Sequence, residues 1–274
     1  MNLHLLVKEL TAIISGTDQP YREARLLAAS LFGGDMAAMY RGYRTDVSPE
    51  TAARLRLAAV RRARGEPIQH ILGEAWFHGR RFICDERALV PRPETETLVD
   101  AVLAAGLPEK PRILDVGTGS GVIGITLALS LPGSAVTATD TSPAAAALAR
   151  ENARFLGALN YTVIETDLTA GLEGGFHAVV ANPPYIPTGD IPGLMREVLF
   201  DPVTALDGGP SGLDCIGRLV YEAAGVLLPG GLLAIEIGCG QSRDVYAMLG
   251  NWSDVMVLDD LTGRPRVVTA RRKP

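Results

Sequence analysis

The chain has 274 residues, of which 47% are hydrophobic and 21% charged, and its formal net charge is -5. This is enough to bury a sizeable core in one large domain or two unequal ones. No apolar run approaches the roughly 18 residues of a membrane-spanning helix, and the N-terminus lacks the profile of a signal peptide, so we expect a cytoplasmic protein without a membrane partner. The negative charge disfavours a partner held through its phosphates, so no direct nucleic-acid partner is expected.

The first part of the chain has the spacing of amphipathic helices. Three helices are expected: residues 3–14, residues 21–32, and a segment that Ser48 caps, with Pro49 at the first helical position. The third carries a basic run that is typical of a solvated face and could also steer an acidic partner. This run consists of Arg54, Arg56, Arg61, Arg62 and Arg64. We expect a helical domain over residues 1–65.

A linker and a second domain follow. Residues 66–90 mix Gly and Pro with aromatic and β-branched residues, which is typical of a linker that carries a short hairpin. Beyond Pro91, short β-rich runs alternate with helical stretches, the signature of a parallel sheet built from β-α-β units. Seven strands are expected, at residues 112–117, 135–140, 161–166, 177–182, 231–238, 254–260 and 266–272. The pattern predicts an α/β domain over residues 91–274.

The cysteines and histidines do not form a recognisable cluster. Cys84, Cys215 and Cys239 are odd in number and far apart, which indicates free thiols in a reducing compartment. The four histidines share no metal-ligand spacing with one another or with acidic clusters. They are His4, His70, His78 and His177. No metal site is expected.

A glycine-rich loop follows the first expected strand of the second domain. Its residues are Asp115, Val116, Gly117, Thr118, Gly119, Ser120 and Gly121, and a helical stretch comes directly after them. Glycines let the backbone turn sharply and approach a ligand at the N-terminus of a helix. Gly119, Gly121 and Gly124 also satisfy the G-x-G-x-x-G pattern of dinucleotide-binding proteins. The loop therefore predicts a nucleotide-type cofactor and leaves its identity open.

Two acidic residues lie at the ends of the next two strands. Asp140 comes about twenty residues after the loop, where a carboxylate can accept hydrogen bonds from ribose hydroxyls. Nicotinamide and S-adenosylmethionine cofactors both carry that ribose. Asp167 could accept from an adenine amino group, although a turn aspartate explains it nearly as well.

The motif that favours one chemistry is Asn182-Pro183-Pro184-Tyr185, at the end of the fourth strand. Two prolines there end the ladder and fix the backbone. An amide or exocyclic amino nitrogen is a poor nucleophile because its lone pair is delocalised. The Asn182 side-chain oxygen and the Pro183 carbonyl could each accept one N–H of such a group, aim its lone pair at a sulfonium methyl and stabilise the developing positive charge, while Tyr185 stacks on the flat group. A Pro-Pro loop with Asn in a turn is the structural alternative.

With these motifs, the segments from Glu66 to Arg271 resemble, in the same order, those of the peptide chain release factor glutamine methyltransferases of the PrmC/HemK type. The matching segments are GEPIQHILGEAWFHGRRF, LVPRPETETLV, ILDVGTGSG, ANPPYIP, ALDGGPSGLD, LLPGGLLAIEIG and DLTGRPRVV. The resemblance implies a small all-α N-terminal domain that recognises the substrate, a hairpin linker, and a seven-stranded, mostly parallel, Rossmann-like sheet. It also implies S-adenosylmethionine as cofactor.

The resemblance further implies a reaction and its residues. Family members methylate the glutamine of the Gly-Gly-Gln tripeptide in class 1 release factors, so a release factor is the expected partner of a monomeric enzyme. Asn182, Pro183 and Tyr185 match the family positions that hold this glutamine, and Pro184 completes the motif. The positions expected to bind the cofactor are Gly117, Thr118, Gly119, Ser120, Gly121, Asp140, Asp167, Leu168 and Asn182.

Two further features come with the resemblance. The segment at residues 91–96 matches one that packs over the site, and in it Arg92, Glu94 and Glu96 could order the cofactor end of the pocket or form linker salt bridges. Leu168 stands where several bacterial relatives carry a tryptophan against the adenine. An apolar wall is expected there instead.

Three alternatives are left open. A ribosomal-protein glutamine methyltransferase has motifs close to these, and only a substrate test separates the two. A DNA adenine methyltransferase needs the same acceptor pair, but it calls for a basic target-recognition region that this chain does not show. A nicotinamide-dependent oxidoreductase or a non-catalytic nucleotide-binding module would leave the Asn-Pro-Pro-Tyr motif without a role.

Overall fold

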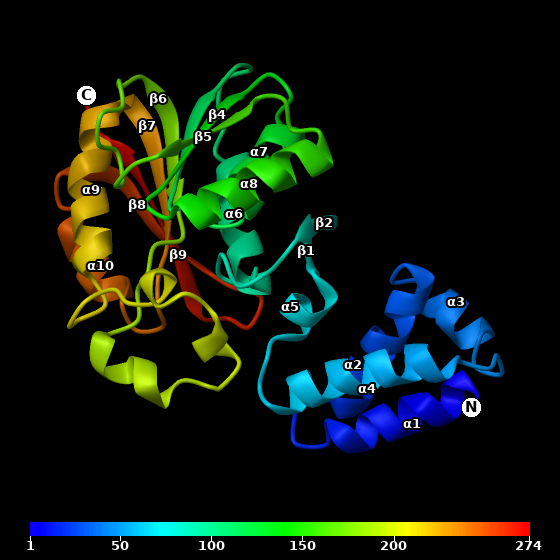
Figure 1. The fold of residues 1–274 in the computed structure, drawn as a ribbon. Helices are drawn as coiled ribbons and strands as arrows, with labels where there is room; N and C mark the ends of the chain where they lie inside the picture. Colours follow the sequence, from blue (N-terminus) through cyan, green and yellow to red (C-terminus); the bar gives the residue numbers. More distant parts are fainter. The chain divides into compact units, whose positions relative to one another are not determined.

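The computed structural model describes residues 1–274, which divide into two compact units (Figure 1). The helical unit comprises Met1–Gly73 together with Met195–Phe200, and the sheet unit comprises Glu74–Leu194 and Asp201–Pro274. The expected division of the chain into a domain, a linker and a second domain stays a prediction.

Five α-helices make up most of the helical unit. They are α1 (Leu3–Ile13), α2 (Pro20–Ala29), α3 (Met36–Arg41), α4 (Pro49–Ala63) and α5 (Ile68–Leu72), with short 3₁₀ turns η1 (Ser30–Phe32) and η4 (Val198–Phe200). The expected cap of α4 is confirmed, because the Ser48 hydroxyl accepts from the backbone N–H of Thr51 and Pro49 is the first helical residue. Helices α3 and α5 were not expected. The cap of α3 is Asp35, whose carboxylate accepts from two backbone N–H groups.

Arg62 on α4 connects distant parts of the helical unit. Its guanidinium is 2.8 Å from the Glu23 carboxylate and 2.7 Å from that of Glu197, and its side chain is only 7% exposed. Glu197 belongs to the six-residue segment that comes to this unit from the far part of the chain. The ion pairs therefore attach that segment to α2 and α4.

The sheet unit begins with the expected hairpin. Strands β1 (Glu74–Phe77) and β2 (Arg80–Ile83) pair antiparallel. A separate seven-stranded sheet follows, with the order β5-β4-β3-β6-β7-β9-β8. Its strands are β3 (Arg112–Val116), β4 (Ala135–Asp140), β5 (Tyr161–Glu165), β6 (Phe176–Ala181), β7 (Leu227–Glu236), β8 (Trp252–Asp259) and β9 (Pro265–Arg272). Six of the strands run in one direction and only β9 runs in the opposite direction. The predicted fold class is therefore confirmed.

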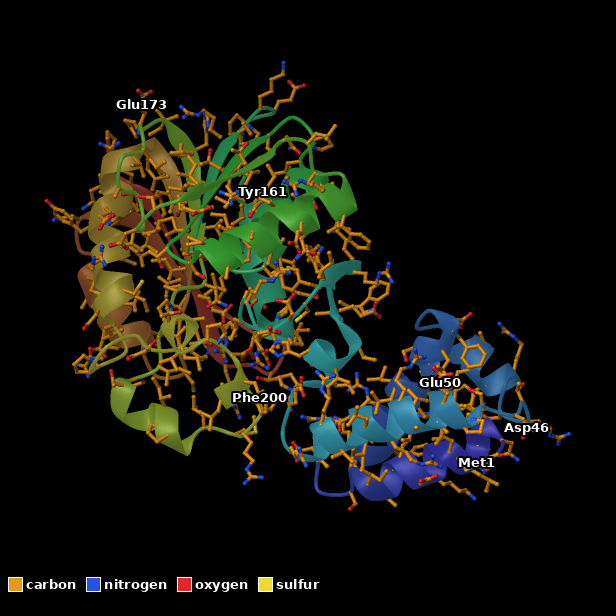
Figure 2. All side chains as sticks on the ribbon, in the orientation of Figure 1. Met1, Asp46, Glu50, Tyr161, Glu173 and Phe200 are labelled. Atoms are coloured by element: carbon orange, nitrogen blue, oxygen red, sulfur yellow. The ribbon has the colours of Figure 1, made fainter.

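Helices cover both faces of this sheet (Figure 1). The helices are α6 (Glu96–Leu103), α7 (Val122–Ser130), α8 (Pro143–Leu156), α9 (Asp214–Val226) and α10 (Ser242–Met248), and the 3₁₀ turns are η2 (Pro93–Thr95), η3 (Thr188–Gly193) and η5 (Val203–Ala205). Ile113 of β3 packs with α6, α7 and α8, whereas its neighbour Leu114 packs with α9 and α10. Successive strand residues point to opposite faces, so this buried strand is apolar on both. Side chains from the three layers fill the unit (Figure 2).

The strand order reverses at the centre of the sheet. β3 pairs with β4 on one side and with β6 on the other, so the connections after β3 and after β6 leave in opposite directions. In open α/β sheets such a reversal leaves a crevice at the carboxyl ends of the strands, where ligands bind. None of the helices has both the length and the apolar character to cross a membrane.

Candidate active site

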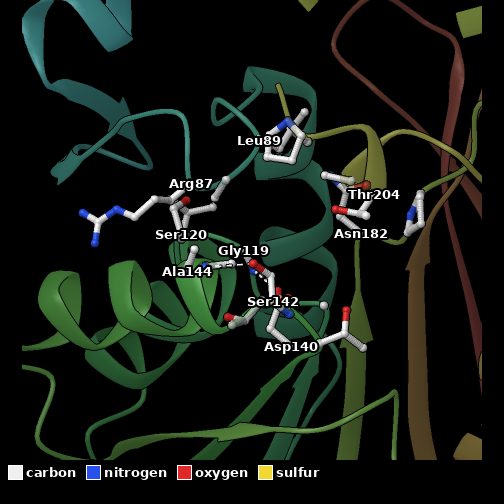
Figure 3. A pocket seen from close by; sticks show the side chains of 18 of the residues that line it. Arg87, Leu89, Gly119, Ser120, Asp140, Ser142, Ala144, Asn182 and Thr204 are labelled. Carbon is white, nitrogen blue, oxygen red and sulfur yellow. Dashed lines mark hydrogen bonds between the residues drawn. The ribbon is translucent and has the colours of Figure 1, made fainter. Parts of the chain in front are cut away.

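A cavity of about 500 Å³ lies in the sheet unit at the carboxyl ends of β3, β4 and β6 (Figure 3). Its wall includes the glycine loop, Asp140 after β4 and Asn182 after β6. The opposite wall comes from segments outside the sheet, around Leu89 and around Thr204. The volume is that of a small-molecule or cofactor site.

The glycine loop is held from behind by a buried polar group. The Asp115 side chain is fully buried, and one of its carboxylate oxygens accepts from the Thr118 hydroxyl at 2.5 Å and from the Gly124 N–H at 3.0 Å. The hydroxyl of Tyr161, on β5 (labelled in Figure 2), is 2.8 Å from that of Thr118. Burial raises the pKa of the Asp115 carboxyl to about 6, against the effect of these hydrogen bonds.

At two positions of this region a side chain larger than that of glycine would collide with its neighbours. A Cβ at Gly121, where φ is +85°, would lie 2.6 Å from the side chain of Ile125. A Cβ at Gly124 would lie 2.7 Å from a carboxylate oxygen of Asp115. A side chain at Gly121 would strain the backbone, and one at Gly124 would displace the Asp115 carboxylate that holds the loop.

Asp140 faces the cavity and also binds the backbone of the glycine loop. One carboxylate oxygen accepts from the backbone N–H of Gly119 at 2.8 Å and the other from that of Ser142 at 2.9 Å (Figure 3). Each oxygen of a carboxylate can accept two hydrogen bonds, so one site on each is available for ligand hydroxyls.

Asp167 and Leu168 line the same cavity. The Asp167 carboxylate forms an ion pair with Arg218 at 2.7 Å, in which both side chains are about half exposed. Leu168 is buried and has a φ of +47°, and its carbonyl accepts from the Thr139 hydroxyl at 2.9 Å. Leu168 supplies apolar surface to the cavity. The Asp167 carboxylate also faces the cavity but is paired with Arg218.

The Asn-Pro-Pro-Tyr motif directly follows β6. The side-chain amide nitrogen of Asn182 donates to the Thr95 hydroxyl at 3.2 Å. The Tyr185 hydroxyl donates to the Glu236 carboxylate at 3.3 Å, and its carbonyl accepts from the Gln241 side chain at 2.9 Å. Burial and the nearby Glu236 charge raise the pKa of Tyr185 well above its ordinary value. The motif is therefore held at both ends by side chains from other segments.

Nine of the predicted site residues line the cavity. They are Gly117, Thr118, Gly119, Ser120, Asp140, Asp167, Leu168, Asn182 and Pro184. Gly121, Pro183 and Tyr185 are not among the lining side chains. Gly121 is the residue before α7, Pro183 is buried, and Tyr185 extends toward β7.

The segment at residues 91–96 lies over the site, as the resemblance implies, and Pro91, Arg92 and Thr95 line the cavity. Arg92 pairs at 2.6 Å with Asp201, whose buried carboxylate also accepts from the Val90 N–H. Glu96 accepts from the His78 N–H in the hairpin turn. The residue that reaches the motif is Thr95, which sequence reasoning passed over. Glu236 and Gln241 were also missed, although an acid within the apolar run of β7 was a visible signal.

Comparison with known proteins identifies the family. The model of the methyltransferase small domain matches residues 94–239, and that of the PrmC N-terminal domain matches residues 6–73. A release factor glutamine methyltransferase of Deinococcus radiodurans is 43% identical over 99% of both chains. Another, of Moorella thermoacetica, is 42% identical over 97% of this chain and 96% of its own. The chain belongs to the release factor glutamine methyltransferase family.

Solved structures agree on the fold. A ribosomal protein L11 methylase from Lactobacillus delbrueckii subsp. bulgaricus is 21% identical, with a TM-score of 0.53 over 69% of this chain and 84% of its own. A methyltransferase from Pyrococcus furiosus is 18% identical, with a TM-score of 0.54 over 72% and 91% of the two chains. At this identity the likeness concerns the fold of the sheet unit alone.

The membership makes this chain an S-adenosylmethionine-dependent methyltransferase, and the cavity fits that cofactor. A glycine loop at the N-terminus of α7, a carboxylate after β4 and the apolar wall at Leu168 suit the polar, ribose and adenine parts of such a molecule. No group of three or more His, Cys, Asp or Glu residues is placed to hold a metal ion.

Proposed function

We propose that this chain methylates the side-chain amide nitrogen of the glutamine in the Gly-Gly-Gln tripeptide of a class 1 peptide chain release factor. The observation that carries the proposal is the position of Asn182, which lines the same cavity as the glycine loop and Asp140. The relatives that match the full chain are release factor glutamine methyltransferases by name. An amide-orienting side chain beside a cofactor site is what such a reaction requires.

We assign the cofactor to the side of the cavity formed by residues 117–120, Asp140, Asp167 and Leu168. The loop offers backbone N–H groups, Asp140 offers acceptor sites for ribose hydroxyls, and Leu168 packs on the adenine. Because the Asp167 carboxylate is paired with Arg218, it contributes less to the binding of the adenine than the backbone around it does. The bound cofactor supplies an electrophilic methyl group on a sulfonium.

The Asn182 side-chain oxygen and the Pro183 carbonyl hold the substrate amide. Each accepts one N–H of the glutamine, which keeps the planar group in one orientation and directs its nitrogen toward the methyl group. As the nitrogen takes the methyl group it becomes positive, and the two acceptors stabilise that charge until the nitrogen loses one proton to solvent. Pro184 keeps the backbone of the motif rigid, and Tyr185, anchored on Glu236, positions the flat group.

The substrate is tested by methyl transfer from labelled S-adenosylmethionine to four acceptors in parallel. These are a class 1 release factor, the same factor with its Gly-Gly-Gln glutamine replaced, ribosomal proteins, and duplex DNA. Label on the first acceptor alone is the expected result. Label on ribosomal proteins or on DNA instead would transfer the function to one of the two alternative methyltransferases.

We further propose that the enzyme is a cytoplasmic monomer whose helical N-terminal domain recognises the release factor. The family model for that domain supports a specialised role for it. Light scattering coupled to gel filtration should give the mass of a single chain, 29.0 kDa. A mass of twice this value would overturn the monomer.

A further inference from the structure

The Thr95 hydroxyl is buried and does not cap α6. Thr95 ends the 3₁₀ turn η2 and its backbone is already helical, with φ -66° and ψ -18°, so it lacks the extended conformation of an N-cap residue. Only 2% of the residue is exposed. Its hydroxyl oxygen lies 3.2 Å from the side-chain nitrogen of Asn182. The Asn182 amide is therefore a partner of this buried hydroxyl.

Glu236 offers a buried acceptor beside the Thr95 hydroxyl. Its side chain is 1% exposed at the end of β7 and accepts from Tyr185 at Oε1, while Oε2 is buried without a partner at normal hydrogen-bond geometry. Burial raises the pKa of Glu236, and the Thr95 hydroxyl, Arg266 and the Tyr185 hydroxyl oppose that rise by favouring the carboxylate. A buried carboxylate is a strong acceptor, so it attracts the proton of a neighbouring hydroxyl.

This orientation determines which end of the Asn182 amide meets Thr95. A hydroxyl that donates its one proton to a carboxylate can only accept from its other neighbour. The NH2 end of the amide satisfies that acceptor, whereas its oxygen would face a second oxygen with no proton between them. A flipped amide would leave the buried Thr95 hydroxyl without a hydrogen-bond partner on that side, which is unfavourable.

We propose that Thr95 is a positioning residue that keeps the side-chain oxygen of Asn182 turned toward the methyl-transfer site, with the Glu236 carboxylate fixing the direction of the hydroxyl. This inference rests on the acceptor role proposed for Asn182. It explains why the segment at residues 91–96 lies against the motif, and it assigns a role to an acid that the reaction itself does not use. Thr95 lines the cavity and Glu236 does not, and both act through the orientation of the Asn182 amide.

The first test replaces the hydroxyl while keeping the shape. Thr95→Val should lower kcat for release factor methylation at least tenfold and change the Kd for S-adenosylmethionine less than twofold. Thr95→Ser restores the hydroxyl and should recover kcat to within about threefold of the parent. Thr126→Val is the matched control, because that hydroxyl is also buried but has no partner. An unchanged kcat in Thr95→Val would overturn the proposal.

A double-mutant cycle separates positioning from general damage. In an Asn182→Ala background, Thr95→Val should change the residual rate less than twofold, because Thr95 acts through the amide. A further tenfold loss in that background would show that Thr95 acts on something other than Asn182, and would also overturn the proposal.

A measurement without substrate keeps the inference separate from the proposed function. The NH2 signals of Asn182, assigned by their loss in Asn182→Asp, should exchange with water at least tenfold faster in Thr95→Val than in the parent. The Thr126→Val protein should match the parent. If the parent fails to label a release factor, the proposed substrate is wrong while this measurement still decides the inference. Rapid exchange already in the parent would overturn it.

Discussion

At the scale of single residues, two side chains near the carboxyl edge of the sheet have different roles. Asn182 projects into the cavity with a neutral amide, while Asp115 is buried behind the glycine loop with a carboxyl. Under the proposed function the first contacts substrate, and the second holds the loop through Thr118 and Gly124. Their substitutions should therefore separate catalysis from stability.

Removal of the Asn182 amide should abolish turnover but not cofactor binding. Asn182→Ala is expected to lower kcat by about 100-fold or more, the loss seen when one donor or acceptor of the transition state is removed, with the Kd for S-adenosylmethionine within twofold of the parent. Labelled methyl transfer and calorimetry measure the two quantities. The exposed Asn251→Ala serves as control. Equal kcat in Asn182→Ala and the parent would refute the acceptor role.

Asp115 should make stability depend on pH. Because burial raises its pKa from 3.8 to about 6, the folded protein retains this proton where the unfolded chain has lost it. The stabilisation from this group is complete below pH 3.8 and is lost as pH rises through 6, by at most about 3 kcal/mol. Urea unfolding of the parent and of Asp115→Asn from pH 4 to pH 8 should show the variant gaining stability relative to the parent as pH rises. A constant difference would contradict this.

At the scale of elements, Arg62 and Arg56 of α4 form ion pairs in different surroundings. Arg62, with Glu23 and Glu197, is nearly buried, whereas Arg56 pairs with Glu9 at side-chain exposures of 38% and 40%. Breaking a buried pair leaves charges without a partner or water, while breaking an exposed pair exchanges it for solvent. The basic run read from the sequence therefore consists in part of structural ion pairs.

Arg62→Ala should destabilise the helical unit far more than Arg56→Ala. We expect a loss of about 3–5 kcal/mol for the first and a much smaller loss for the second, because solvent screens the exposed pair. Hydrogen exchange of the amides of α1, α2 and α4 reports the stability of this unit directly. Segment 195–200 should lose protection in Arg62→Ala only. Equal losses in the two variants would show that the burial of Arg62 carries no energetic weight.

At the scale of the whole molecule, cofactor binding should stabilise the fold. At 100 times its Kd, S-adenosylmethionine adds about 2.7 kcal/mol to the folded state, a rise in Tm of about 5–10 °C for a domain of this size. Thermal unfolding measures this shift, and Asp140→Ala should abolish it. A nicotinamide dinucleotide should give no shift. A shift with that compound instead would contradict the assignment of the cavity.

Sequence and structure agree where local signals suffice. The seven strands, the cap at Ser48 and the glycine loop each depend on residues close together in the chain, and the structure places them where the pattern predicts. Nine predicted site residues share one cavity because the carboxyl ends of β3, β4 and β6 meet at one edge. Short helices such as α3 and α5 were missed, since five or six residues show too little periodicity to be recognised.

What the sequence by itself determined is the order of elements, the motifs and the family resemblance, because hydrophobic period, caps and motif spacing are local properties of the chain. The tertiary structure alone decided which distant side chains meet. The Thr95 hydroxyl lies against Asn182, 87 residues away, and Arg62 meets Glu197 across 135 residues. Such contacts follow from how the layers pack, and no local pattern of residues in the chain records which distant side chains that packing brings together.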